Sequence, residues 1–386
     1  MSNGILLVTG GAGFIGGAVC AAALDTGWSV RVLDSLRPDV HGSTPVMDDR
    51  IDFRHHDVRD AAAVASALDG VTVVCHQAAK VGLGVDFADA PDYVSSNEVG
   101  TATLLAGMAA AGVGRLVLAS SMVVYGEGAY SEATRAGGGA SGPTPPTRPA
   151  PRAVSDLDAG RFDPLGADGE PLHPELIDEE SILDPRNVYA ATKLGQEFLA
   201  SAWARATGGV AAALRYHNVY GPGMPQNTPY AGVASLFRSA IERGKAPRVF
   251  EDGKQRRDFV HVRDVASANL AAIGWTSTGP PGSFRAFNVG SGDVHTIGDV
   301  AAALTRHAVG PAPIVTGEYR LGDVRHITAS SERLRAELEW MPSVTFEDGM
   351  REFATAPLRA AVQAPPPSAP WRPVGSGASR EPSAWD

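Results

Sequence analysis

The chain has 386 residues, which is enough to bury a large core, and one or two domains are expected. Its formal net charge of −10 argues against a nucleic-acid partner, and no apolar run is long enough to cross a bilayer. The two cysteines, Cys20 and Cys75, both stand in apolar stretches. We therefore expect buried thiols in a cytoplasmic protein, with neither a disulfide framework nor a metal site.

Apolar runs alternate with helical patterns through the N-terminal part of the chain, up to about Ser120. Strands are expected at Ile5–Thr9, Ser29–Asp34, Ile51–His56, Val71–His76 and Arg115–Ser120, with helices at about Phe14–Asp25, Ala61–Leu68 and Tyr93–Ala111. Strands that alternate with helices predict a parallel, doubly wound sheet. The ligand of such a sheet binds at the carboxyl ends of its strands.

Residues from about Gly126 to Pro185 break this alternation, because the run Gly137–Pro146 is too rich in glycine and proline for a helix or an interior strand. The sequence predicts a long insertion here, either a lid or a disordered excursion. Regular structure resumes with the helix that holds Tyr189 and the strand Val210–Tyr216. Later helices are expected at Gly232–Arg243, Val262–Ile273 and Ile297–His307, and short strands of a smaller domain at Pro247–Phe250 and Phe284–Val289.

A glycine-rich turn joins the first strand to the first helix. Gly10, Gly13 and Gly16 stand where small residues let the backbone approach a pyrophosphate and where the helix N-terminus stabilises its charge. Asp34 ends the second strand, where a carboxylate meets the adenosine ribose hydroxyls and repels a 2′-phosphate. This pattern favours NAD over NADP, although the nearby Arg37 softens the preference.

The ends of the next two strands add to the predicted cofactor site. Asp57 and Val58 follow the third strand and are expected near the adenine. His76, at the end of the fourth strand, is interpreted as a structural hydrogen-bonding residue. The small residues after it allow a close approach of the cofactor, and Lys80 lies near the expected substrate cleft.

These features predict an α/β protein with a Rossmann-type doubly wound parallel sheet and a smaller C-terminal mixed α/β substrate-binding domain. Residues 1–216 would form the NAD-binding domain, with the insertion at about 127–185, and residues 217–355 would mainly form the substrate-binding domain. Residues 356–386, rich in proline, serine and glycine, are expected to be a flexible tail.

Tyr189 and Lys193 stand four residues apart and share one face of a helix. On that face the ammonium can stabilise the phenolate and make the tyrosine a base near neutral pH. Ser121 ends an earlier apolar run and is the third polar group expected beside them.

With these motifs in this order, the chain resembles the extended short-chain dehydrogenase/reductases, in the NAD-dependent sugar-nucleotide epimerase/dehydratase family, over about residues 4–350. The matching runs are Thr9–Gly16, Asp34, Asp57–Val58, His76–Ala79, Asn97 with Gly100–Thr101, Ser120–Ser121 through Val124–Gly126, Tyr189–Lys193, Arg215–Pro222, Arg257–Val262 and Arg320–Asp323.

The resemblance implies a role for each matched residue. Tyr189 would be the acid/base, Lys193 would hold the nicotinamide ribose and lower the tyrosine pKa, and Ser121 would hydrogen-bond the reacting sugar hydroxyl. Further cofactor contacts are implied for Phe14, Ile15, Gln77, Ala78, Ala79, Asn97 and Tyr216. Substrate contacts are implied for Asn218 at the sugar or diphosphate, Val233, Phe250 at the nucleobase, and Arg257 and Arg320 as a diphosphate clamp.

The chain departs from the family pattern in two places. Dehydratases and decarboxylases of the family carry an acidic residue just after the serine, whereas here Met122 and Val123 follow, and neither moves a proton. The interval from Ser121 to Tyr189 is also about forty residues longer than the family pattern. The insertion, with Ala119–Glu127 and Gly322–His326, is similar to bacterial enzymes that epimerise dTDP-6-deoxyhexoses.

The resemblance therefore implies an NAD-dependent nucleotide-sugar 4-epimerase acting on a UDP- or dTDP-hexose. It would oxidise C4 transiently to a 4-keto sugar and reduce it again on the opposite face. A nucleotide-4-keto-sugar reductase would use the same side chains and is the alternative. A non-catalytic NAD-binding sensor is disfavoured, because Tyr189, Lys193 and Ser121 are all present. The family's homodimers pair two long helices, here about Tyr93–Ala111 and Tyr189–Ala206.

Overall fold

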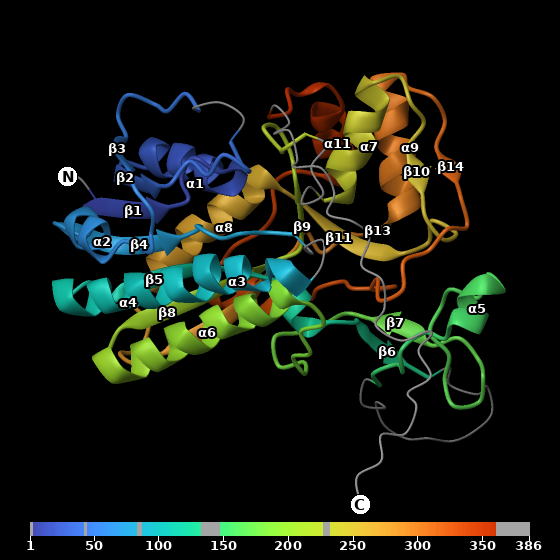
Figure 1. The fold of residues 1–386 in the computed structure, drawn as a ribbon, viewed down its shortest axis with the longest axis horizontal. Helices are drawn as coiled ribbons and strands as arrows, with labels where there is room; N and C mark the ends of the chain where they lie inside the picture. The colour runs from blue at the N-terminus through green and yellow to red at the C-terminus, as the bar shows by residue number, and fades with distance from the viewer. Residues whose placement is uncertain (1–2, 42–44, 83–86, 133–146, 227–231, 360–386) are drawn as a thin grey trace, which may run out of the picture.

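A seven-stranded parallel sheet forms the core of the larger, left-hand part of the structure in Figure 1. The computed structural model describes residues 3–41, 45–82, 87–132, 147–226 and 232–359. From edge to edge the strands are β12 (Phe284–Val289), β8 (Val210–Tyr216), β5 (Arg115–Ser121), β4 (Val71–His76), β1 (Ile5–Thr9), β2 (Ser29–Asp34) and β3 (Asp52–His55). All neighbouring pairs are parallel, so the predicted doubly wound sheet is confirmed.

Helices cover both faces of this sheet. One face carries α1 (Phe14–Asp25) and α8 (Val262–Trp275), and the other carries α2 (Ala61–Ala67), α4 (Gly100–Ala111) and α6 (Val188–Thr207). Successive residues of β1 face opposite cores, with Leu6 and Val8 on the α1 side and Leu7 on the α2 side. Burial on both faces explains why these strands are continuous apolar runs rather than alternating ones.

The strand order reverses at β1. The chain runs outward from β1 through β2 to β3, and then crosses to β4 on the other side of β1. The loops after β1 and β4 therefore diverge and leave a crevice at the carboxyl ends of the strands. Gly10 and Gln77, the first residues after these two strands, both line it.

The strand Phe284–Val289 was expected in the smaller domain, but the structure places it in the main sheet. β12 pairs with β8 in parallel, from Phe284 opposite Ala211 to Val289 opposite Tyr216. Every residue of β8 is buried, so its outer edge needs a partner strand to satisfy the backbone N–H and C=O groups. Residues after 217 consequently contribute to the sheet as well, and α8 from the same stretch packs against α1.

The long helix expected at Tyr93–Ala111 is interrupted. It consists of α3 (Ala90–Tyr93), the π-helical segment η2 (Val94–Val99) and α4. Thr101 Oγ1 donates a hydrogen bond to the carbonyl of Asn97 at 2.6 Å, within this wide turn. Such turns are common at functional sites, and this one carries Asn97, whose side chain is fully buried.

A smaller region of the chain after β8 surrounds a separate apolar core. Its sheets are β9 (Asn218–Tyr220) with β11 (Arg256–His261) and β13 (Val294–Thr296), and β10 (Arg248–Val249) with β14 (Ile314–Val315). Its helices are α7 (Val233–Glu242), α9 (Ile297–Ala308) and α11 (Phe346–Thr355). Tyr220, Phe237 and Phe353 are buried between them. Figure 1 shows this region beside the strand ends of the main sheet.

The described part of the insertion is folded. β6 (Ala129–Ser131) pairs antiparallel with β7 (His173–Glu175), and the short helix α5 (Val154–Asp158) lies between them in sequence. The bridge between Ile177 and Ala329 joins the end of the insertion to the segment before α10 (Glu332–Leu338). Figure 1 shows β6, β7 and α5 together at the lower right. The glycine- and proline-rich run Gly137–Pro146 lies outside the described residues.

The first residues of the expected tail pair with the chain. The amide of Gly223 donates to the carbonyl of Pro357, and the amide of Arg359 donates to the carbonyl of Met224, both at 3.0 Å. The remainder of the expected tail lies outside the described residues. In the part of the chain that the structure covers, no helix combines the length and apolar character needed to cross a bilayer.

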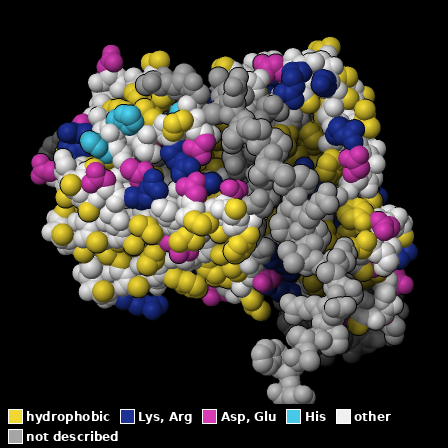
Figure 2. Space-filling view, viewed as in Figure 1, with side chains coloured by type: hydrophobic (Ala, Val, Ile, Leu, Met, Phe, Trp, Pro, Cys, Tyr) yellow, Lys and Arg dark blue, Asp and Glu magenta, His cyan; other side chains and the backbone are white. Residues whose placement is uncertain are grey.

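Apolar side chains gather on one face of the molecule. Figure 2 shows them over the region where Figure 1 places α4 and α6. Phe198 of α6 is 64% exposed, and Val99, next to α4, is 49% exposed. Large exposed apolar side chains that cluster in this way are typical of interaction surfaces.

Candidate cofactor and substrate site

The glycine turn after β1 forms a cradle that side chains would fill. Gly10 has a φ of +70°, and a Cβ there would lie 2.6 Å from the backbone nitrogen of Ala78. A Cβ on Gly16 would overlap the carbonyl of Gly10. Gly13, the N-cap of α1, has extended dihedrals, so the helix N-terminus opens towards this turn. Close backbone approach beside a helix N-terminus fits a dinucleotide pyrophosphate.

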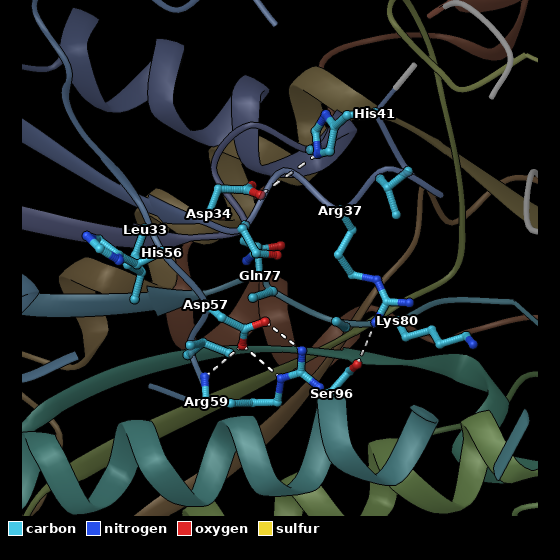
Figure 3. A pocket seen from close by; sticks show the side chains of 17 residues that line it. Leu33, Asp34, Arg37, His41, His56, Asp57, Arg59, Gln77, Lys80 and Ser96 are labelled. Atoms are coloured by element: carbon cyan, nitrogen blue, oxygen red, sulfur yellow. Dashed lines mark hydrogen bonds and ion pairs between the residues drawn. The ribbon is translucent and has the colours of Figure 1, made fainter. Parts of the chain in front are cut away.

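Asp34 closes the crevice at the end of β2. Its Oδ2 accepts a hydrogen bond from the Ala12 amide at 3.0 Å, and its Oδ1 accepts one from the Leu36 amide at 2.9 Å. The Nε2 atom of His41 lies 3.8 Å from Oδ1 (Figure 3). The carboxylate is thus fixed in the crevice lining, where it suits the hydroxyls of a ribose.

Arg37 and Lys80 are held by acidic neighbours on the crevice rim. The Arg37 guanidinium bonds Asp39 at 2.9 Å and Asp92 at 2.8 Å, and Lys80 Nζ lies 2.6 Å from the same Asp92. These cations hold the pKa of the Asp92 carboxyl well below its usual range. Because Arg37 is already paired, it is poorly placed to neutralise a 2′-phosphate, which agrees with the expectation of NAD. The substrate contact expected of Lys80 remains a prediction.

Asp57 and Val58 line the crevice, and the adenine contacts expected of them remain a prediction. The Arg59 guanidinium bonds the Asp57 carboxylate at 2.7 Å and lowers its pKa (Figure 3). Val58 packs into the core between β4 and α4 and presents only a small exposed surface. The sequence predicted these two positions but not Arg59.

The loop after β4 is fixed by buried amides. Asn97 Oδ1 accepts a hydrogen bond from the Lys80 amide at 2.7 Å, and its Nδ2 donates to the Lys80 carbonyl at 3.0 Å. Gln77 Nε2 donates to the Tyr216 hydroxyl and to Asn269 Oδ1, each at 3.0 Å. Ala78 and Ala79 of this loop line the crevice. Asn97 and Tyr216 therefore act on the site through the loop that they hold.

The side chains of Phe14 and Ile15 point into cores at the start of α1. Phe14 packs against the core of the smaller region and Ile15 against the α1 face of the sheet. The cofactor contacts expected of these two residues remain a prediction. Such contacts would come from the backbone at the helix N-terminus. Val233 likewise begins α7 and packs against the smaller core.

Tyr189, Ser121 and Lys193 meet at the carboxyl edge of the sheet. Asn187 caps α6 by accepting a hydrogen bond from the Ala190 amide at 2.8 Å, which places Tyr189 in the first turn. Ser121, the last residue of β5, lies close enough to the Tyr189 hydroxyl to lower its pKa. Lys193 Nζ lies 5.9 Å from the centroid of the Tyr189 ring and donates to the carbonyl of Ala119 at 2.9 Å. The structure thus brings together the three residues expected to be catalytic.

Burial shifts the pKa values of this dyad in opposite directions. It raises the pKa of Tyr189 to about 12, and the nearby Ser121 side chain partly offsets this rise. It lowers the pKa of Lys193 to about 7, and the charge of Glu197 opposes that fall. Near neutral pH the ammonium therefore changes its charge beside the phenol, so a modest electrostatic change alters the proton affinity of both groups.

Glu197 is a buried residue that the sequence analysis missed. Its carboxylate accepts hydrogen bonds from Ser120 Oγ at 2.5 Å and from Arg215 at 2.8 and 3.0 Å. Arg215 Nη1 also donates to the Tyr125 hydroxyl at 2.8 Å. The spacing of four residues from Lys193 was the available signal, because it places both side chains on one face of α6.

The expected substrate residues of the smaller region form a second cluster. Arg257 Nη2 donates to the carbonyl of Val324 at 2.6 Å, and its Nη1 donates to the carbonyl of Arg325 at 2.9 Å. The Arg320 guanidinium carbon lies 5.0 Å from the ring centroid of Phe250, in a cation–π contact. Arg320, an expected diphosphate contact, and Phe250, the expected nucleobase contact, thus adjoin one another.

His217 and Asn218 lead from the sheet into this cluster. Within the described residues, neither ring nitrogen of His217 nor Oδ1 of Asn218 has a hydrogen-bond partner, although all three atoms are buried. Burial lowers the pKa of His217 to about 3, and the charge of Arg257 contributes to this fall. Buried polar atoms without partners are rare in proteins and suit a ligand or an ordered water. His217 lies between β8 and β9 within the matched run Arg215–Pro222, which was the available sequence signal, but the sequence analysis gave it no role.

Comparisons with known proteins agree with this geometry. A model of the NAD dependent epimerase/dehydratase family matches residues 6–149 and 165–290. The chain is 33% identical over 357 residues to the dTDP-L-rhamnose 4-epimerase of Burkholderia thailandensis, covering 91% of this chain and 94% of that protein.

Two solved structures share the fold over nearly the whole chain. The UDP-glucose 4-epimerase of Thermus thermophilus in complex with NAD has a TM-score of 0.70 at 28% identity, covering 91% of this chain and 97% of that one. The UDP-glucose 4-epimerase of Thermotoga maritima with UDP-glucose has a TM-score of 0.67 at 25% identity, with the same coverage. The expected family and its cofactor NAD are confirmed, and this chain belongs to the NAD-dependent epimerase/dehydratase family.

Proposed function

We propose that this protein is a nucleotide-sugar 4-epimerase that acts on a UDP- or dTDP-hexose. The observation that carries the proposal is that Tyr189 lies beside Lys193 in the first turns of α6, with Ser121 at the end of β5 close enough to lower the tyrosine pKa. Met122 and Val123 follow Ser121 directly and cannot transfer a proton. Removing a proton and returning it to the same oxygen needs one proton-transferring group, whereas elimination of water needs a second.

NAD, when bound, supplies a reversible hydride acceptor at the sugar carbon. The residues that would hold it are Gly10 and Gly13 at the pyrophosphate, Asp34 at the adenosine ribose and Lys193 at the nicotinamide ribose. The cradle around Gly10 leaves no room for a Cβ, which fits close backbone approach to a dinucleotide.

Tyr189 removes the proton of the C4 hydroxyl and later returns it to the same oxygen, while Ser121 hydrogen-bonds that hydroxyl and fixes its position. The protonated form of Lys193 favours the phenolate, and Glu197, one turn further along α6, favours that protonated form. The 4-keto sugar turns over between these two events.

The nucleotide half of the substrate would lie in the second cluster. Arg257 and Arg320 suit a diphosphate, because planar guanidinium groups bind phosphate oxygens in pairs. Phe250 adjoins Arg320 and offers a ring face to a base. The unpartnered oxygen of Asn218 accepts a hydrogen bond from a sugar hydroxyl.

The purified protein, incubated with UDP-glucose, UDP-galactose, dTDP-glucose or dTDP-L-rhamnose, tests this proposal by NMR of the sugar signals. We expect one pair of C4 epimers to interconvert to equilibrium with no net change in added NAD(H). Steady NAD(P)H consumption on a nucleotide 4-keto sugar, without epimerisation of any substrate, would instead establish the reductase. An epimerase keeps its cofactor through purification, so the absorbance spectrum of the protein is a second readout.

Among the substrate classes, a dTDP-6-deoxyhexose is the first choice. The relative at 33% identity is a dTDP-L-rhamnose 4-epimerase and covers nearly the whole chain. We expect kcat/KM for dTDP-L-rhamnose to exceed that for UDP-glucose by about tenfold or more, which corresponds to ~1.4 kcal/mol of transition-state discrimination. The reverse order would assign the enzyme to UDP-hexoses.

The apolar surface over α4 and α6 supports a homodimer of the enzyme. Phe198 on α6 and Val99 next to α4 expose large apolar side chains. We expect a dimer by size-exclusion chromatography with light scattering, and monomers from Phe198→Lys, because a buried charge at the centre of an interface is costly. A monomeric native protein would contradict the dimer and leave the epimerase proposal intact.

A further inference from the structure

A buried charge cluster joins the insertion to the proposed nucleotide half of the site. Arg325 is fully buried, and its Nε donates to Asp163 Oδ1 of the insertion at 2.7 Å. Its Nη1 donates to Glu251 Oε2 at 2.8 Å and to Asp252 Oδ1 at 2.7 Å. Three carboxylates therefore surround one guanidinium, and one of them comes from the insertion.

Arg152, which lies in the insertion, binds one of these three carboxylates, that of Glu251, through its other oxygen. Arg152 Nη1 donates to Glu251 Oε1 at 2.8 Å, and its Nη2 donates to the carbonyl of Asp323 at 2.7 Å. The Arg152 and Glu251 side chains are only 8% and 3% exposed. Glu251 is thus held between Arg152 and Arg325, each bonded to a different oxygen.

The backbone around Arg325 is fixed as well. Glu127, at the start of the insertion, accepts hydrogen bonds from the Arg325 amide at 3.0 Å and the His326 amide at 3.2 Å. The carbonyls of Val324 and Arg325 accept hydrogen bonds from the guanidinium of Arg257. The expected diphosphate contact Arg257 is therefore oriented by a segment that the insertion holds in place.

The other two expected nucleotide contacts adjoin the same cluster. Phe250 directly precedes Glu251, and Arg320 lies over the Phe250 ring, close in sequence to Asp323. We propose that the insertion positions the nucleotide-binding side chains, with Arg152 and Asp163 as its positioning residues. The described part of the insertion that holds Arg152 and Asp163 thus acts as a support for these side chains rather than as a lid. This inference rests on the proposed function, since it assigns these side chains to a nucleoside diphosphate.

The family comparison indicates that the two positioning residues of the insertion are not part of the common family pattern. The family model covers residues 6–149 and resumes at residue 165, so Arg152 and Asp163 lie in the gap between the matched segments. Their partners Glu251 and Arg325 lie within and beyond the second segment. A support added outside the common pattern would adjust the nucleotide half without altering Tyr189 or the glycine turn.

Calorimetric titration of the full-length protein with UDP and with dTDP tests this role, because free nucleotides report on the nucleotide half without turnover. For Asp163→Asn and Arg152→Met we expect Kd for the bound nucleotide to rise about tenfold. KM for the nucleotide sugar rises in parallel, while bound NAD is retained. Asp163→Glu keeps the charge and is expected to recover most of the affinity.

The matched control is Asp156→Asn, which makes the same change in the same insertion. Asp156 pairs with Arg161, whose side chain is 57% exposed. Its Kd for nucleotide is expected to stay within about twofold of the native value, because exposed ion pairs contribute little.

The outcomes separate the inference from the proposed function. Native-like nucleotide affinity in both Asp163→Asn and Arg152→Met overturns the inference, as does a loss of kcat with unchanged Kd, which a lid would give. If Asp163→Asn fails to fold, Arg152→Met carries the test alone. A native protein that binds UDP or dTDP but epimerises no sugar contradicts the proposed function while the inference stands. A native protein that binds neither nucleotide overturns both.

Discussion

The proposed cofactor half and the proposed nucleotide half of this site are held together by different kinds of contact. At Gly10 the crevice depends on close backbone contact, because a Cβ there would meet the backbone of Gln77 and Ala78, although Asp34 and Lys80 also line it. Around Arg325 the support consists of long charged side chains drawn from the insertion and from the C-terminal part of the chain. The first kind of site is sensitive to added atoms, and the second is sensitive to the loss of a charged partner.

Tyr189→Phe should cause the largest loss of activity, and it should leave the binding of both NAD and nucleotide unchanged. Removing the hydroxyl deletes the proton carrier, so we expect turnover to fall by about 10²–10⁴-fold. Bound NAD and Kd for UDP or dTDP should be unchanged, because the ring remains in place on α6. A loss of less than about tenfold would mean that another group moves the proton.

Gly10→Ala should break the cofactor half alone. The added Cβ would meet the Ala78 backbone, and the left-handed φ of +70° disfavours any side chain. We expect loss of bound NAD, seen in the absorbance spectrum, and destabilisation of about 1–3 kcal/mol by thermal or denaturant unfolding. Nucleotide affinity should persist.

Gly27→Ala is the matched control for the steric clash that Gly10→Ala introduces. Gly27 also has a positive φ, +85°, but a Cβ there would have no atom within 4 Å. It should therefore show the backbone cost, about 1 kcal/mol, without loss of NAD. Equal loss of NAD in both variants would show that the turn tolerates a Cβ at Gly10. Retention of NAD would then depend on the overall stability of the protein.

The smallest effect is a difference in acid stability between two buried histidines, one in each half. His76 bonds Thr9 and Thr101, whereas His217 has no hydrogen-bond partner among the described residues. Burial lowers the pKa of each to about 3, below the ordinary value of 6.5. Between these values the unfolded state binds more protons, so stability falls as pH falls from 6.5 towards 3, by at most about 1.4 kcal/mol per pH unit for each histidine.

His217→Phe should make this pH dependence shallower and should not destabilise the protein at pH 7, since it removes an unpaired imidazole. His76→Phe should also flatten the slope, but it removes one hydrogen-bond partner from each of two buried hydroxyls, those of Thr9 and Thr101, and should lower stability at pH 7. Urea unfolding at pH 7 and pH 5 measures both effects. Equal destabilisation of the two variants at pH 7 would mean that His217 is hydrogen-bonded in solution, for example to a buried water.

The cofactor half could be predicted from the sequence because its determinants are local. The turn at Gly10 and the position of Asp34 follow from strand and helix patterns between Ile5 and Asp34, and the structure places both in one crevice. The Tyr189–Lys193 pair is equally local, being one turn of α6. Only Ser121 had to be brought to it by the sheet.

The nucleotide half was not predictable in the same way. The Arg325–Asp163 pair joins residues 162 positions apart, and charged residues in a loop ordinarily face solvent. The glycine and proline of the insertion indicated an irregular segment but gave no information on what it would contact. The strand Phe284–Val289 was misplaced for the same reason. Its local pattern predicts a strand, but its pairing with β8 depends on the topology of the sheet.

The position of β12 has a consequence for synthesis of the chain. While the nascent chain still ends near residue 216, β8 has no strand on its outer side, and an unpaired edge of this length invites association with other chains. The sheet is complete only once residue 289 has left the ribosome. A fragment of residues 1–216 should therefore aggregate rather than act as an autonomous cofactor-binding unit.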